Sequence, residues 1–425
     1  MNPQRYPALY LSAWWLCVVT LPWYIFSNSV CIVLLFVVWL AEGNFRQKWD
    51  RWRENRWVWP FVIFFLLHAL GLLYSENLSS GLFELEKKLS LVVLPILAAT
   101  GLPLNKASFR TLSNGFIASC FVLVLASMLG SAVALFQTVK PIQNFDPETD
   151  SLFHSLFPGR SEAWEYFSYI ELGKGFDTHP SYFSLYLIFC ILLILHQIFN
   201  SEKVRPFQFI TLILFTFFIA LLSSRMAVVS LVTTVTFAIA VNSKGRWMLP
   251  TRMAALTCFL AFLLFSIWIN PVSRFRIWVE PRSTQLTFDN QTHYWNSVNL
   301  RLLEWSASSN VIKTSWPIGT GTGDAQAHLE NYYAKYDLGI FHMALNGHNQ
   351  YLQTFVELGL LGIAALLLCF YLPAYRAFQH NPLHFMFILL FGLMCLSETM
   401  LARQKGIVFF ALFQSLFLIT HSDDR

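Results

Sequence analysis

Charged residues are scarce in this sequence. Asp, Glu, Lys and Arg make up 12% of the 425 residues, whereas 56% are hydrophobic and the mean hydropathy is +0.50. At that ratio a water-soluble protein has too few polar side chains to cover its surface, so we expect the chain to lie in lipid. The formal net charge of only +5 argues against a nucleic-acid-binding surface.

Cysteine is also sparse, and it is missing from the polar parts of the chain. The seven cysteines all fall in apolar runs, and there is no CxxC or HExxH pattern. They are therefore interpreted as small buried hydrophobes rather than disulfide partners or ligands. No cluster with divalent-metal geometry is visible in the polar segments either, so we expect no metal and no cofactor.

Long apolar runs dominate what is present. A membrane span takes about 20 mostly apolar residues, and Trp and Tyr gather at the ends of these runs, as at membrane interfaces. The pattern predicts an all-α polytopic membrane protein forming one domain over 1–425, with about 12 transmembrane helices (ten to fourteen). The predicted spans are 8–26, 28–42, 57–74, 88–101, 111–136, 180–199, 206–222, 226–242, 252–269, 349–372, 383–400 and 406–420.

The positive charges predict the orientation. Short basic loops at 43–56, 200–206 and 243–252 are expected in the cytoplasm. The two long polar segments, 137–179 and 270–347, then lie outside, and the second is expected to be partly helical, over about 294–313.

Several cations fall on the outward side, where positive charge is otherwise avoided. They could form ion pairs with Glu84, Glu86, Glu357 and Glu398, or extend to lipid headgroups. Taken together, and with a histidine at the same depth, they favour a phosphate or pyrophosphate ligand. The residues are Lys87, Lys88, Arg225, Arg301, Arg403, Lys405 and His348.

Four short motifs in fixed order fall on this same side. They are Ser224-Arg225, Arg301-x-x-x-Trp305, Pro317-x-Gly-x-Gly-x-Gly323, and His348-Asn349 followed after nine residues by Gly359-x-x-Gly362. Gly359 and Gly362 are expected to line a helix stripe that admits a close neighbour, with His348 in the first turn of that helix. The set resembles the O-antigen ligase/O-antigen polymerase superfamily of bacterial envelope glycan transferases.

The resemblance implies a GT-C-like fold and a metal-independent glycosyltransferase. It implies a donor glycan on undecaprenyl pyrophosphate and an acceptor hydroxyl, on lipid A–core for a ligase or on a growing glycan for a polymerase. It implies an inner-membrane protein acting in the periplasm. In this interpretation His348 is the general base or acceptor-orienting residue, and Arg301, Arg225 and Arg403 bind the pyrophosphate.

Some assignments stay open. His179, Asn349 and Lys88 are possible additional site residues, although His179 before Pro180 also fits a helix start. Arg301 and Glu304 are spaced for a simple i,i+3 pair. A non-enzymatic glycolipid flippase or transporter is the alternative from another functional class, and it predicts inverted repeats and a polar path through the membrane.

Overall fold

The computed structural model describes residues 6–137, 162–201, 204–241, 249–282, 296–336 and 345–420. Within these ranges the chain forms helices joined by turns, without a strand. The expected all-α architecture is therefore confirmed. It follows from an apolar chain that must satisfy its backbone hydrogen bonds within each helix.

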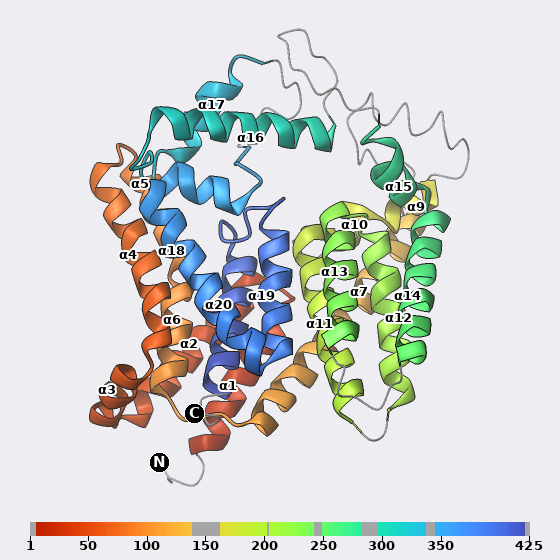
Figure 1. Cartoon of the computed structure of the whole chain (residues 1–425), viewed down its shortest axis with the longest axis horizontal. Coiled ribbons are helices and arrows are strands. Elements are labelled where there is room, and N and C mark those ends of the chain that lie inside the picture. The colour runs from red at the N-terminus through yellow and green to blue at the C-terminus, as the bar shows by residue number, and fades with distance from the viewer. Residues whose placement is uncertain are drawn as a thin grey trace.

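Two groups of helices stand side by side in Figure 1. The first contains the N-terminal helices and the last three. Its members are α1 (Tyr6–Thr20), α2 (Ile25–Glu42), α3 (Phe45–Glu54), η2 (Arg56–Val58), α4 (Trp59–Gly71), η3 (Leu72–Tyr74), α5 (Leu78–Lys88), α6 (Ser90–Thr100), α18 (Gln350–His380), α19 (Pro382–Met394) and α20 (Gln404–Thr420).

The second group contains the middle of the chain. Its members are α7 (Lys106–Gln137), α9 (Glu162–Tyr166), α10 (Tyr169–Lys174), α11 (Pro180–Asn200), α12 (Pro206–Leu221), α13 (Arg225–Val241), α14 (Leu249–Ile269), α15 (Pro271–Arg274) and η4 (Phe275–Val279). Contacts of α19 with α11 and α13, and of α1 with α7, join the two groups.

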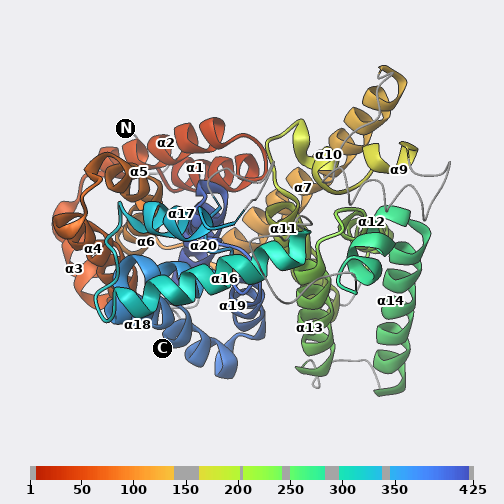
Figure 2. The same cartoon turned by 90° about the horizontal axis from the view of Figure 1, so that it is seen from above.

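Two further helices lie across one end of the bundle. Figure 2 shows α16 (Ser297–Thr314) crossing from above α18 toward α11 and α13, with α17 (Ala325–Tyr333) beside it. The beginning of α1 and the end of α20 lie at the opposite end (Figure 1). The helix predicted over about 294–313 is thus confirmed, and it forms a cover over one end of the bundle.

Phenylalanine rings fill the seam between the groups. Phe189 of α11 packs against Phe387 of α19 and Phe413 of α20, with ring centroids 5.1 and 4.6 Å apart. Phe116 of α7 lies 4.9 Å from Phe413. Edge-to-face aromatic contacts of this kind stabilise beyond simple burial, so the seam fixes how the helix ends are placed.

Six helical segments are long and apolar enough to cross a membrane, judged on the described ranges. They are Ile25–Glu42, Arg56–Tyr74, Lys106–Gln137, Pro180–Asn200, Pro250–Ile269 and Gln350–His380. Five more apolar helices (α1, α12, α13, α19 and α20) are shorter, with 10–17 residues. Each of the twelve predicted spans overlaps a helix, but the count of twelve crossings stays a prediction. Parts of both predicted loops, 137–179 and 270–347, lie outside the described residues.

One helix departs from the sequence-based expectation. Gly359 adopts φ 61° and ψ −149° within α18, so two helical segments meet there at a kink. Its neighbour Leu360 donates its amide to the carbonyl of Pro317 over 2.9 Å. A Cβ atom at Gly359 would overlap that carbonyl oxygen. Gly359 therefore makes space for the loop at Pro317 and Ile318 rather than for a neighbouring helix. The predicted close helix–helix contact is wrong at this position.

Candidate active site

The glycine-rich run 317–323 anchors the cover to the bundle. The amides of Thr320 and Gly321 donate to the carbonyls of Val356 and Glu357 over 2.8 and 3.0 Å, which are groups that the kink in α18 leaves without helical partners. On the other side, Asp324 accepts from the amides of Glu76 and Asn77 over 2.7 and 2.8 Å. The run thus holds α16 above α18 and α4.

His348 lies at the start of α18, but not in its first turn as expected. Asn349 is the N-cap, and its side-chain oxygen accepts from the amides of Tyr351 and Leu352 over 2.9 and 3.1 Å. The Asn349 amide group also donates to the carbonyl of Leu396 over 3.1 Å. His348 precedes the cap with φ 35°, because the chain must turn sharply to enter the helix. The His-Asn pair therefore joins a strained turn to a helix cap.

Two carboxylates flank the imidazole of His348. Nδ1 lies 3.3 Å from Oε2 of Glu398, close enough for an ion pair although not aligned as a hydrogen bond. Nε2 lies 3.8 Å from Oε1 of Glu304. Burial by itself lowers the pKa of His348, but Glu304 and Glu398 outweigh it and raise the pKa above its ordinary value. A protonated imidazole is therefore favoured at rest.

Glu398 is the shared partner of the cluster. It lies in the turn between α19 and α20, and its Oε1 accepts from the Arg301 guanidinium and the Ser181 hydroxyl, each over 2.9 Å. Burial opposes its ionisation, but His348 and Arg301 hold the pKa of this carboxyl well below its usual value. Arg301 thus pairs with Glu398 rather than with Glu304, so the simple i,i+3 pair is not formed.

Glu304 has a different environment. It is buried on α16, and its Oε2 has no hydrogen-bond partner among the described residues. Burial raises the pKa of Glu304 to about 7, although His348 and Arg301 act in the opposite direction. The two carboxyls beside one imidazole therefore differ: Glu398 stays ionised, while Glu304 can exchange a proton near neutral pH.

Three arginines line a pocket of about 160 Å³ beside this cluster. Arg301 comes from α16, Arg225 from the start of α13, and Arg276 from η4. The Nε of Arg301 is buried without a hydrogen-bond partner among the described residues. Tyr169 forms another wall, with its ring 3.5 Å from the Arg276 guanidinium. The guanidinium groups make this pocket suited to a phosphate group.

Arg225 is held in place by its own partners. Its Nη2 donates to Oε2 of Glu280 over 2.6 Å and to the Ser297 hydroxyl over 2.9 Å, while its Nε donates to the carbonyl of Arg276 over 2.6 Å. Glu280 also accepts from the Ser297 amide over 2.8 Å, at the start of α16. This network joins α13, η4 and α16 and orients both arginines toward the pocket.

His179 lines the same pocket and caps α11. Its Nδ1 accepts from the Ser181 amide over 3.4 Å. Burial lowers the pKa of His179 to about 4, opposed by Glu398 and assisted by Arg403, His348 and Arg301. The imidazole is neutral at neutral pH, so its direct role here is that of a cap. Arg403 is exposed in the turn before α20, close enough to act on this pKa.

Lys88 belongs to a neighbouring buried cluster rather than to the pocket. It pairs with Glu84 over 3.1 Å and with Glu357 over 3.9 Å. Glu357 also accepts from Gln353 over 2.8 Å, and Gln353 accepts from the Gly347 amide over 3.0 Å. Lys88 therefore forms ion pairs, which was the alternative to phosphate binding. Through Glu357 and Gln353 this cluster supports the turn that carries His348.

Sequence reasoning missed several members of the site. Arg276 and Glu280 were not singled out, and Glu398 and Glu304 were considered only as ion-pair partners. Arg276 satisfies the rule that selected Arg225, since it is a cation on the side that otherwise avoids positive charge. No sequence signal distinguishes Glu398 from other acidic residues. No group of three or more His, Cys, Asp or Glu suited to a metal occurs in the part of the chain that the structure describes.

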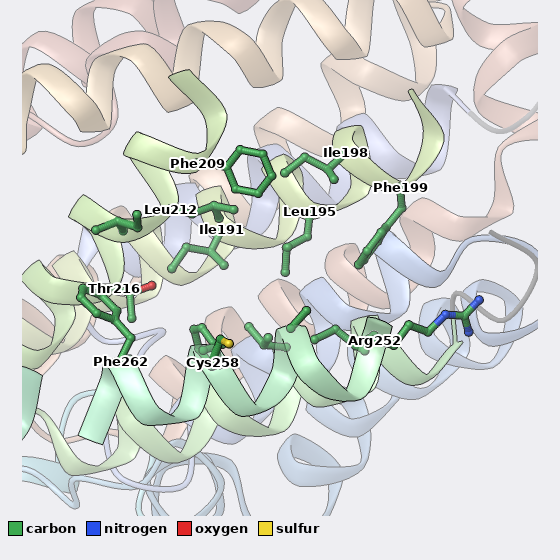
Figure 3. Close-up of a pocket in the computed structure, with 15 residues that line it drawn as sticks. Ile191, Leu195, Ile198, Phe199, Phe209, Leu212, Thr216, Arg252, Cys258 and Phe262 are labelled. Atoms are coloured by element: carbon green, nitrogen blue, oxygen red, sulfur yellow. The ribbon is translucent and has the colours of Figure 1, made fainter. Parts of the chain in front are cut away.

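A different pocket has no comparable chemistry. It has a volume of about 420 Å³ between α11, α12, α13 and α14, and its lining is almost entirely apolar. Figure 3 shows Phe209, Leu212 and Leu195 around it, with Arg252 at one end. A surface of this kind suits hydrocarbon, so size and apolar character alone do not identify the site.

The fold and the pocket define a membrane protein that gathers arginines and a carboxylate-flanked histidine at one end of its helix bundle. Residues 210–367 match the family model described as O-Antigen ligase. The middle of the chain is thus similar to the O-antigen ligase family. The match includes Arg225, Arg301 and His348, whereas Lys88, His179 and Arg403 lie outside it. No curated protein matches the chain.

Proposed function

We propose that this protein transfers a glycan from undecaprenyl pyrophosphate to an acceptor hydroxyl at the periplasmic face of a bacterial inner membrane. The single observation that carries the proposal is the three-arginine pocket directly beside His348 and its two carboxylates. Fixed guanidinium groups stabilise charge that develops on a leaving pyrophosphate, and in a partly dry site this contributes several kcal/mol.

In the proposed reaction the acceptor oxygen bonds to the anomeric carbon of the glycan while the bond from that carbon to the pyrophosphate oxygen breaks. Arg301, Arg225 and Arg276 receive the departing pyrophosphate. The acceptor proton passes to the pair formed by His348 and Glu304. Glu304 is the proton acceptor in that pair, because a carboxyl with a pKa of about 7 is partly deprotonated at neutral pH. His348, which is protonated at rest, orients the acceptor oxygen.

The proposed acceptor is lipid A–core, which makes the protein an O-antigen ligase. The family fits a repeat-unit polymerase as well, and the two differ only in the acceptor. Deleting the gene separates them. Lipid-linked polymer that accumulates without attachment supports the ligase, whereas core-linked single repeats identify a polymerase. Normal surface glycan in the deletion strain would contradict both.

The site itself is tested by His348→Ala and Arg301→Ala. Each is expected to abolish glycan attachment while the protein remains inserted and abundant. The matched control is His328→Ala, because His328 is exposed on α17 at the same end of the molecule. Normal attachment by either site variant would refute the assignment.

A further inference from the structure

A second polar pocket lies at the other end of the bundle, away from the candidate active site. It has a volume of about 400 Å³ and opens between the start of α7, the end of α11 and the junction of α18 with α19. His348 and Glu398 lie at the opposite ends of α18 and α19, so the two pockets are separated by the length of these helices. The proposed transfer reaction makes no use of this second pocket.

The lining of this pocket is basic. Lys106 and Arg110 come from the first turns of α7, His196 from α11 and His380 from the end of α18. None of the lining residues that the structure describes is acidic. Lys106 and His196 also make contacts of their own, and Arg110 is an exposed lining residue. The pocket therefore favours an anion.

The inner wall is apolar and contains one buried hydroxyl. Phe109, Leu193, Leu383 and Phe417 form this wall. Ser113 also lines the pocket, is 2% exposed, and its hydroxyl has no hydrogen-bond partner among the described residues. A buried hydroxyl without a partner costs free energy, so a ligand atom that accepts from Ser113 would be stabilised here.

The position in the fold favours a lipid over a soluble anion. The pocket lies at the helix ends nearest the basic loops, on the face that the positive-inside rule assigns to the cytoplasm. An amphiphile satisfies both parts of the lining: its phosphate meets Arg110 and Lys106, and its glycerol and first acyl carbons meet the apolar wall. Basic pockets between transmembrane helices on this side commonly bind anionic lipid headgroups.

We propose that this pocket binds the phosphodiester headgroup of an anionic glycerophospholipid of the inner leaflet. Bound lipid joins α7 and α11 of one helix group to α18 and α19 of the other. Because ligand binding to the folded state adds to its stability, the lipid is expected to raise the unfolding temperature.

The experiment measures the unfolding temperature of the full-length protein in neutral detergent with added phosphatidylglycerol, phosphatidylcholine or inorganic phosphate. Phosphatidylglycerol is expected to raise it more than phosphatidylcholine or phosphate does. Arg110→Gln is expected to lose about half or more of that difference, since Arg110 is a principal cation of the pocket. Arg376→Gln, an exposed arginine of α18 outside the pocket, is expected to keep it.

Three results would overturn the proposal. They are an equal response of the wild type to both lipids, an equal loss in the Arg110 and Arg376 variants, and an equal stabilisation by inorganic phosphate, which would indicate a soluble anion instead. Native mass spectrometry of the Arg110→Gln protein provides a second readout, because retained phosphatidylglycerol is expected to fall while retained phosphatidylcholine does not.

Discussion

The carboxylate of Glu398 lies 3.3 Å from Nδ1 of His348, although the two residues belong to different inter-helix turns. The same carboxylate accepts from Arg301. One buried acidic residue therefore connects the histidine beside the pocket to an arginine inside it, and the position of each depends on the other.

The first prediction concerns this connection. Glu398→Gln keeps the size of the side chain but removes the charge that orients both His348 and Arg301. Because misplacement of reacting groups by about 1 Å costs roughly 100-fold in rate, transfer is expected to fall by about that factor. The measurement is glycan attachment by purified protein in vesicles.

The matched control is Glu330→Gln, an exposed carboxylate on α17 at the same end of the molecule, which is expected to leave transfer unchanged. Unchanged transfer by the Glu398 variant would show that the shared carboxylate has no part in positioning the site.

The second prediction concerns pH. The pKa of Glu304 is raised to about 7, so its ionised, proton-accepting form is populated as pH rises through that value. Transfer is expected to increase from pH 6 to pH 8 in the wild type. In Glu304→Gln this rise should disappear, with activity lower by about 100-fold.

Stability should change in the opposite sense. A carboxyl whose pKa is higher in the folded than in the unfolded state favours folding at low pH and loses that contribution as pH rises toward 7. Glu304→Gln should therefore unfold at a higher temperature than the wild type at pH 8. A variant that keeps the wild-type pH profile would exclude Glu304 as the proton acceptor.

The third prediction concerns the kink in α18. Gly359→Ala places a side chain at φ 61° and against the Pro317 carbonyl. The strain alone amounts to about 1–3 kcal/mol, so the unfolding temperature and glycan transfer should both fall. Gly130→Ala in α7 is the control, because a Cβ there meets nothing within 4 Å. It should be neutral, or stabilising by up to about 1 kcal/mol. Equal behaviour of the two variants would contradict the role given to the kink.

The fourth prediction concerns orientation. Lys335→Cys, just beyond α17, should react with a membrane-impermeant thiol reagent added outside the inner membrane. Arg53→Cys on α3, at the other end of the molecule (Figure 1), should react only after permeabilisation. Cys258 is exposed on α14 and is replaced by Ser beforehand. The reverse labelling pattern would invert the proposed topology.

Much of the candidate site was predictable because its motifs are local. The resemblance marked Arg225, Arg301 and His348, and the structure brings the first two to one pocket with the third beside them. The same reasoning treated Gly359 as part of a regular helix, since a glycine spacing carries no information about a loop that docks from elsewhere. Sequence reasoning also placed His348 in the first turn of α18, because the spacing between His348 and the glycines does not show where the helix begins.

Apolar length and clustered motifs can be recognised in a linear chain, so the sequence predicted an all-helical membrane protein and the candidate site residues Arg225, Arg301 and His348. The tertiary structure alone decided that Glu398 and Glu304 flank His348, that Arg276 joins the pocket, and that Lys88 is neutralised elsewhere. A buried charge is stable only when it is paired, and here the partners come from segments far apart in the sequence.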